Sequence, residues 1–134
     1  MSAIEARLRG IEDRFALEDL VSAYALLVAR GDGPGVAALF SDDGEFVGLR
    51  HKVRGCEELL AFYVASARPG AIVPLVANKV FEISKDTATG RSTLAALSPG
   101  PGRRLLCGAY DDDFVRGEEG WKFRRRRFTT YFEQ

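Results

Sequence analysis

Apolar side chains recur every three or four residues along the first quarter of the chain. This spacing places them along one side of an α-helix. We therefore predict an N-terminal helix over residues 4–28 whose apolar side chains form one buried stripe. The stripe consists of Ile4, Leu8, Ile11, Phe15, Leu17, Leu20, Val21, Tyr24, Leu27 and Val28.

Glycine and proline divide the following residues into shorter elements. Gly31 and Gly33 end the first helix, and Pro34 suits the first turn of a short helix that ends near Ser41. Residues 44–55 have the length and the turn residues of a small hairpin. Residues 56–68 are typical of a third helix, which ends before Pro69.

The second half of the chain is rich in strand-forming residues. Residues 71–83, 87–98, 103–116 and 120–132 form four such runs, and the segments "SKD", "PGPG" and "GEEG" separate them. Three successive turns would join four long strands into a meander. Helices followed by an antiparallel sheet predict the α+β fold class.

Length and composition narrow the class of protein. The chain has 134 residues, and we predict a single domain over residues 1–134. Its 19 basic and 19 acidic residues leave no net charge, so we expect neither nucleic acid nor a membrane as a partner. We expect a cytoplasmic protein because the N-terminus has no apolar run of signal-peptide length. Cys56 and Cys107 are expected to be free thiols, and these cysteines and one histidine do not suggest a metal or cofactor.

The four arginines at 124–127 do not form a single basic patch. They lie in a predicted strand, where successive side chains point to opposite faces of the sheet. If the turn at 117–120 closes a hairpin, Arg116 meets Trp121, and Asp111–Asp113 lie roughly opposite Arg124 and Arg125. We therefore predict a ladder of ion pairs between these strands.

His51 is the one histidine of the chain and the natural general base if the protein needs an imidazole. Its neighbours are polar or basic, and it falls in the small early hairpin. A catalytic base must converge on a pocket, and nothing in this segment indicates that it does. We interpret His51 as a solvated loop residue.

Tyr24 lies on the apolar stripe of the first helix, so its ring is expected to fill part of the core. A buried hydroxyl needs a hydrogen-bond partner. Two interpretations remain open, because this partner is either a ligand oxygen in a cavity or a backbone carbonyl.

The whole chain resembles the SnoaL-like branch of the nuclear-transport-factor-2-like superfamily. This superfamily includes polyketide cyclases, scytalone dehydratase and ketosteroid isomerase. The similarity rests on segments whose order and spacing match, among them "IEDRFALEDLVSAYALLVARGD", "ALFSDDGEF", "VANKVFEI" and "GAYDDDFVRGEEGWKF". The resemblance implies a cone-shaped α+β barrel of cystatin-like fold, with N-terminal helices packed in a strongly curved antiparallel sheet. It also implies an apolar pocket and a homodimer formed through the sheet.

The resemblance also shows which family residues are missing. Tyr24 matches the tyrosine of the dehydratases, but Ala29 and Pro74 occupy the positions of their aspartate and first histidine. The second histidine position falls near Ser98, and the base of the isomerase falls on Gly48. Asp112 approximately matches the aspartic acid that pairs with the tyrosine in the oxyanion hole of the isomerase. An oxyanion hole without a base leaves the substrate proton with no acceptor.

Our leading hypothesis is therefore a protein that binds a small, mostly apolar ligand with a carbonyl or hydroxyl group, without the Asp/His acid–base pair of the family. We assign no catalytic residue. The candidate ligand-binding residues are Tyr24, Tyr63, Asn78, Tyr110, Asp112 and one C-terminal arginine, Arg126 or Arg124.

Two alternatives stay open. The first is a metal-independent lyase or isomerase acting on a polyketide-, steroid- or aromatic-type substrate, whose base comes from an unexpected position. Its candidate bases are Asp19, Asp112, Cys107 and His51. The second alternative is a subunit without chemistry, as in the small subunits of ring-hydroxylating oxygenases, which share this fold.

Overall fold

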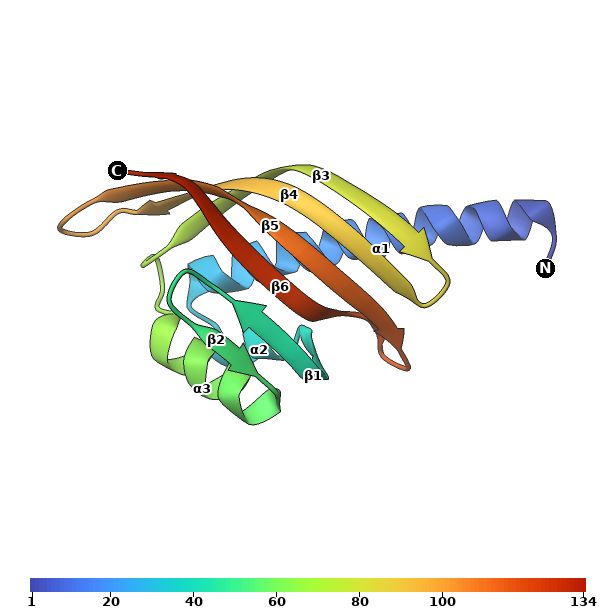
Figure 1. The fold of residues 1–134 in the computed structure, drawn as a ribbon, viewed down its shortest axis with the longest axis horizontal. Helices are drawn as coiled ribbons and strands as arrows, with labels where there is room; N and C mark the ends of the chain where they lie inside the picture. The colour runs from blue at the N-terminus through green and yellow to red at the C-terminus, as the bar shows by residue number, and fades with distance from the viewer.

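The computed structural model describes all residues from 1 to 134 and contains three helices and six strands (Figure 1). The helices are α1 (Ala3–Arg30), α2 (Gly33–Ala37) and α3 (Cys56–Ser66). The strands are β1 (Phe40–Val47), β2 (Lys52–Arg54), β3 (Val73–Ser84), β4 (Thr87–Ser98), β5 (Arg104–Gly117) and β6 (Gly120–Glu133). None of the helices combines the length and the apolar character that a bilayer crossing requires.

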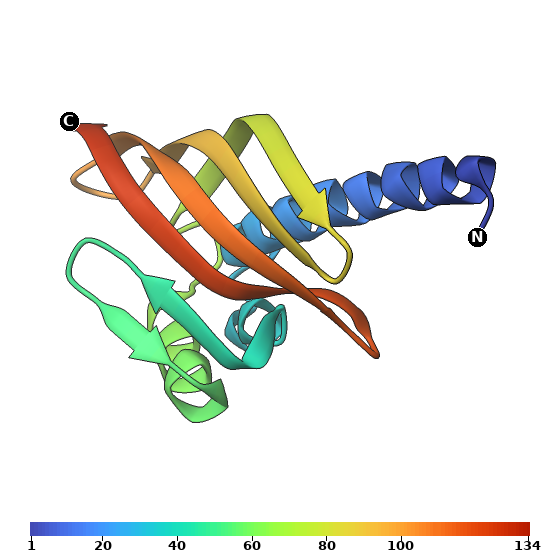
Figure 2. The ribbon, with the colours of Figure 1, turned by 45° about the vertical axis from the view of Figure 1, so that its right-hand side comes forward.

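The strands form one sheet in the order β2-β1-β6-β5-β4-β3. Figures 1 and 2 show the four long strands β3–β6 curving around α1, with α2 and α3 beside β1 and β2. The predicted meander of four antiparallel strands is confirmed. The predicted α+β fold with helices packed in a curved sheet is confirmed, although β1 pairs with β6 in parallel and the sheet stays open at β2 and β3.

Local residues define both ends of α1. The Ser2 side chain accepts a hydrogen bond from the Glu5 backbone N–H at 3.1 Å, which is the usual N-cap contact. At the other end Gly31 has a φ of 75°, and its N–H bonds to carbonyls of the last turn. A glycine is needed here because the left-handed conformation strains other residues, and because a Cβ atom would lie 2.3 Å from the Pro69 nitrogen.

The apolar residues of α1 do not form one buried stripe, so this prediction is wrong. Leu17, Leu20, Val21 and Tyr24 are buried against the sheet as expected. Four residues of the first half, namely Ile4, Leu8, Ile11 and Phe15, are exposed. The N-terminal part of α1 extends beyond the end of the sheet (Figure 2), and at 3.6 residues per turn these four side chains lie roughly opposite to the buried side of the helix.

The predicted ladder between β5 and β6 is only partly correct. Asp113 lies opposite Arg125, but the register pairs Asp112 with Arg126 and Asp111 with Arg127. The ladder is also not confined to the surface. Asp112 and Arg126 both point to the inner face and are buried, because a register shift between Asp113 and Phe114 changes which arginine faces inward. The predicted contact of Arg116 with Trp121 is confirmed, with the guanidinium carbon 4.7 Å from the ring centre.

Candidate functional site

An apolar cavity of about 190 Å³ lies inside the cone, between the concave face of the sheet and the helices. Its walls come from α1, α3 and strands β1, β3, β4, β5 and β6, so residues far apart in the sequence enclose it. Twelve of its 14 lining residues are hydrophobic. The apolar walls include Val28, Phe46, Phe62, Leu94, Leu106 and Phe128.

Three tyrosines place polar atoms at this cavity. Tyr24 from α1, Tyr63 from α3 and Tyr110 from β5 all line it and are nearly fully buried. The Tyr24 and Tyr63 hydroxyl oxygens are 2.7 Å apart and share a hydrogen bond. Two hydroxyl protons are present and this bond uses one of them, so the other is free to be donated to a ligand.

Burial keeps these hydroxyls protonated. Loss of solvent raises the pKa of Tyr24 well above its ordinary value, and the pKa values of Tyr63 and Tyr110 are also raised. The nearby Arg126 guanidinium opposes this effect but does not reverse it. The three tyrosines are therefore hydrogen-bond donors at neutral pH and not phenolate bases.

A buried ion pair between Asp112 and Arg126 packs against the rings of Tyr24 and Tyr110. The Arg126 Nε lies 3.1 Å from an Asp112 carboxylate oxygen, and both side chains are almost completely excluded from solvent. The Arg126 guanidinium carbon is 3.4 Å from the Tyr110 ring centre and 4.3 Å from that of Tyr24. Neither Asp112 nor Arg126 lines the cavity, so we interpret this pair as a support that fixes the two tyrosine rings.

Burial makes the Asp112 carboxyl group easier to protonate than an exposed one. Burial raises the pKa of this carboxyl group from 3.8 to about 6, although the charge of Arg126 acts in the opposite direction. When the pKa of a carboxyl group is higher in the folded state, the group makes its full contribution to stability at pH values below its unfolded pKa. This contribution is lost as the pH rises through the folded pKa.

This shift predicts a pH dependence that belongs to Asp112. Between pH 4 and pH 7, the unfolding free energy of the parent should fall relative to that of Asp112→Asn by up to about 3 kcal/mol, which corresponds to about two pKa units. Urea unfolding of both proteins across this range measures the difference, in which other titrating groups cancel. A difference that is constant or increases with pH would contradict the assignment.

The mouth of the cavity has a more polar lining. A hollow of about 400 Å³ adjoins the cavity through shared residues such as Phe46 and Phe128, and it is bordered by Arg50, His51 and Arg104. Arg104 forms an ion pair with Glu133, which also borders the mouth. His51 is exposed as expected, but its ring centre lies 5.1 Å from that of Phe62, a cavity residue. The loop that carries His51 thus borders the mouth of the cavity, which its sequence did not indicate.

The other predicted ligand-binding residues lie outside the cavity. Asn78 is exposed on β3 with a φ of 56°, and its amide donates to Thr93 Oγ1 at 2.7 Å. It occupies an irregularity in the β3–β4 pairing, between Ala77 and Val80, which strand alternation does not reveal. Of the two arginine candidates, Arg126 is buried behind the tyrosines, whereas Arg124 is exposed.

The positions that the family resemblance singles out lie at or near this site. Pro74 lines the cavity, and Gly48 and Ser98 border its mouth. Ala29 follows the cavity residue Val28, and its carbonyl accepts a hydrogen bond from Gly70. The interior therefore presents no titratable group at these four positions. Among the alternative bases, Asp19 and Cys107 do not border either hollow.

Sequence reasoning missed most of the apolar wall. Phe46, Phe62, Leu106 and Phe128 line the cavity but were not among the predicted site residues. Their apolar character is a signal, but it does not distinguish a cavity wall from a filled core.

No cluster of three or more histidine, cysteine, aspartate or glutamate side chains is positioned to hold a metal ion.

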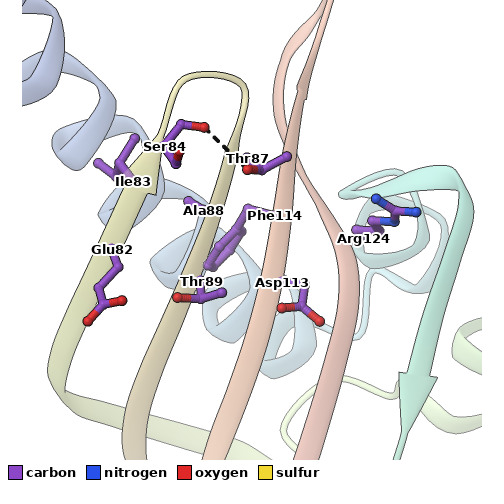
Figure 3. Close-up of a pocket in the computed structure, with 9 residues that line it drawn as sticks. All are labelled: Glu82, Ile83, Ser84, Thr87, Ala88, Thr89, Asp113, Phe114 and Arg124. Carbon is purple, nitrogen blue, oxygen red and sulfur yellow. Dashed lines mark hydrogen bonds between the residues drawn. The ribbon is translucent and has the colours of Figure 1, made fainter.

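A second hollow, of about 510 Å³, lies on the outer face of the sheet near the β3–β4 turn. Figure 3 shows Glu82, Thr89 and Asp113 side by side on β3, β4 and β5, with Arg124 at one side. Most of its lining is polar and none of these four side chains is buried. We assign it no ligand, because binding sites for small apolar molecules are enclosed and mainly apolar.

The architecture belongs to the cystatin-like class of α+β folds, in which a curved sheet wraps around a helix. The chain can also be assigned to a family, which is a narrower class than the fold. A family model described as a SnoaL-like domain matches residues 9–127, so the chain belongs to the SnoaL-like family and the resemblance found in the sequence is confirmed.

Solved structures agree with this fold. An NTF2-like protein with a cystatin-like fold from Novosphingobium aromaticivorans has a TM-score of 0.83 and 23% identity, covering 96% of this chain and 88% of that one. A candidate scytalone dehydratase from the same organism has a TM-score of 0.83 and 21% identity, covering 93% and 88%. A hexachlorocyclohexane dehydrochlorinase, LinA-type3 from Novosphingobium barchaimii, has a TM-score of 0.84 and 20% identity, covering 96% and 92%. Comparison with curated proteins finds no match.

Proposed function

We propose that this protein binds a small, mostly apolar molecule with a carbonyl or hydroxyl oxygen in the interior cavity, without acid–base chemistry of its own. The cavity volume of about 190 Å³ suits a compact ligand of one or two rings. Its walls supply hydrophobic contact, and the tyrosine pair supplies the polar contact that orients the ligand oxygen.

The observation that carries this proposal is the spare hydroxyl proton of the Tyr24–Tyr63 pair. The pair lies on the wall of an otherwise apolar cavity, and its internal hydrogen bond uses only one of its two protons. A ligand oxygen that accepts a hydrogen bond from the second hydroxyl would give both hydroxyl protons an acceptor. The positions at which relatives place an aspartate and a histidine hold Ala29 and Pro74, which supports binding without proton transfer.

The proposal is tested by comparing acetophenone with α-methylstyrene, which has a similar shape but no oxygen. Replacing both tyrosines, in Tyr24→Phe/Tyr63→Phe, should shift the affinity ratio of the two compounds against the ketone by roughly three- to tenfold, the usual strength of one hydrogen bond. We expect Tyr24→Phe alone to cause most of this shift. Isothermal titration calorimetry of both compounds measures the ratio.

The matched control is Tyr131→Phe, since Tyr131 is exposed and removing its hydroxyl should leave the ratio unchanged. An unchanged ratio in the double variant would show that the hydroxyl pair does not contact the ligand oxygen. If only Tyr63→Phe shifts the ratio, the donor is Tyr63 and the role assigned to Tyr24 is wrong.

A second candidate function is a metal-independent dehydratase or isomerase, and the position of His51 favours it over other enzyme assignments. The imidazole borders the cavity mouth and packs near Phe62, so a substrate that extends from the cavity could reach it. In a dehydration, His51 would take a proton from the carbon next to a carbonyl, and the imidazolium so formed would give this proton to the leaving hydroxyl group, which departs as water. Asp112 is less suited because its carboxylate faces Arg126 and does not line the cavity.

A β-hydroxyketone such as 4-hydroxy-4-phenylbutan-2-one distinguishes the two functions, because loss of water forms a conjugated enone with strong ultraviolet absorbance. Turnover that disappears in His51→Gln would support the enzyme. Absence of turnover together with binding of acetophenone would support the binding protein. The non-catalytic subunit gains no support from the structure, because side chains do not fill the cavity.

A further inference from the structure

The exposed half of α1 carries an apolar surface that nothing in the chain covers. Ile4, Leu8, Ile11 and Phe15 are 70%, 53%, 53% and 63% exposed, and Figures 1 and 2 show this part of the helix extending away from the sheet. We call these four residues the α1 stripe. A group of large apolar side chains on one side of a projecting helix is typical of an interaction surface.

The spacing of the α1 stripe is that of a coiled-coil seam. Its members are separated by four, three and four residues, which is the alternation of the a and d positions in a seven-residue repeat. At 3.6 residues per turn, the stripe faces roughly opposite to the buried side formed by Leu17, Leu20 and Tyr24. A second helix can therefore pack on the stripe in residues 4–15 without entering the space that the sheet occupies.

The seam ends within α1. The next two positions of the repeat are Glu18 and Ser22, and Ser22 Oγ already accepts a hydrogen bond from Lys79 of β3 at 3.4 Å. The stripe therefore comprises four apolar layers and stops where the protein's own sheet begins. This is shorter than an autonomous coiled coil, but α1 is already ordered by its buried half, so pairing does not have to fold the helix.

The charges beside the stripe indicate the orientation of a partner helix. Glu5, Glu12 and Asp19 occupy the e positions, and Arg7 and Arg14 occupy the g positions. None of these side chains has an ion-pair partner within the chain. In a parallel pair each g residue meets the next e residue of the other helix, so Arg7 would face Glu12 and Arg14 would face Asp19. An antiparallel pair would instead place arginine beside arginine and glutamate beside glutamate.

We propose that a second copy of this chain docks on the α1 stripe, with the two helices parallel and in register. The opposite charges at e and g positions are the signature of a self-complementary parallel pair. Four apolar side chains from each helix bury less area than a standard interface of about 1,600 Å². The dimer is therefore weak and forms with increasing protein concentration.

Sedimentation velocity over a range of protein concentrations tests this dimer. Ile11→Asp should weaken association at least tenfold, since it places two carboxylates in the seam. Leu26→Asp is the matched control, because Leu26 is 58% exposed on the same helix but lies outside the stripe. A parent that stays monomeric at all concentrations would overturn the proposal. A dimer that persists in Ile11→Asp would also overturn it and would direct attention to the outer face of the sheet.

A charge exchange tests the orientation. Arg7→Glu should weaken the dimer, and adding Glu12→Arg should restore it, because the pair is rebuilt with reversed charges. In a protein without Cys56 and Cys107, Ile11→Cys should cross-link the two copies under mild oxidation, since identical positions meet in a parallel pair. Cross-linking that instead requires cysteines at both position 8 and position 11 would show an antiparallel arrangement and overturn the proposed one.

Discussion

Replacement of Arg126 by methionine is expected to lower the free energy of unfolding by about 3–5 kcal/mol, the usual result of removing one member of a buried ion pair. Methionine is similar to arginine in length and flexibility, so the change removes the charge with little loss of volume. Asp112 would then be buried without its partner, because the Arg126 guanidinium is its one ion-pair contact. The contacts of Arg126 with the rings of Tyr24 and Tyr110 would be lost as well.

Chemical denaturation at pH 7.5 measures this effect, with Arg127→Met as the control. Arg127 is the next residue of β6 and is exposed without an ion-pair partner, so the same substitution there should change stability by less than about 0.5 kcal/mol. Adding Asp112→Leu to Arg126→Met should recover part of the loss, since the uncompensated carboxylate is removed. A loss below about 1 kcal/mol in the single variant would show that Asp112 and Arg126 are not a buried pair.

Replacement of Ala96 by phenylalanine is expected to weaken the binding of acetophenone at least 100-fold. Ala96 is a buried residue of β4, and it borders both the cavity and its mouth. An apolar cavity of about 150 Å³ is large enough to hold a benzene ring. A phenyl group attached at position 96 would therefore occupy most of the space of about 190 Å³.

The control for this substitution is Ala95→Phe. Ala95 is the preceding residue of β4, and successive side chains of a strand point to opposite faces, so its phenyl group would lie on the outer side. Titration calorimetry should show parent-like binding in Ala95→Phe and none in Ala96→Phe, with both proteins folded by circular dichroism. Parent-like binding in a folded Ala96→Phe would place the ligand outside the cavity.

Most helices and strands were predictable from the sequence because they depend on the spacing of apolar residues and on turn residues that are close together in the chain. The helical spacing around Tyr24, the glycines that follow α1 and the turns between β3 and β6 predicted most of the secondary structure. The parallel pairing of β1 with β6 was not predictable in this way. It joins strands about 80 residues apart, and no hairpin turn connects them to indicate the register.

The exposure of the α1 stripe shows a second limit of sequence patterns. Ile4 and Leu8 recur at helical spacing, as Leu17 and Leu20 do, yet only the latter two are buried. The two pairs lie on roughly opposite sides of α1, and spacing alone does not predict which side the sheet covers or how far along the helix it extends. The length of the sheet is a property of the tertiary structure.

The candidate site was predictable in part. The sequence placed Tyr24 on the inner side of the helix and named Tyr63 and Tyr110 as further candidates, and all three line the same cavity. The inward position of Arg126 depends on the irregular β5–β6 register, and the position of His51 depends on how the β1–β2 turn folds toward α3. Such long-range arrangements are not encoded in the local alternation of polar and apolar residues.

A crystal structure of the parent protein soaked with acetophenone would locate the ligand and its polar contact. We expect the aromatic ring inside the cavity, between residues such as Phe62 and Leu94, with the ketone oxygen at hydrogen-bond distance from the Tyr24 or Tyr63 hydroxyl. A cavity that remains empty at saturating ketone, or a ketone whose oxygen points away from both hydroxyls, would contradict this expectation.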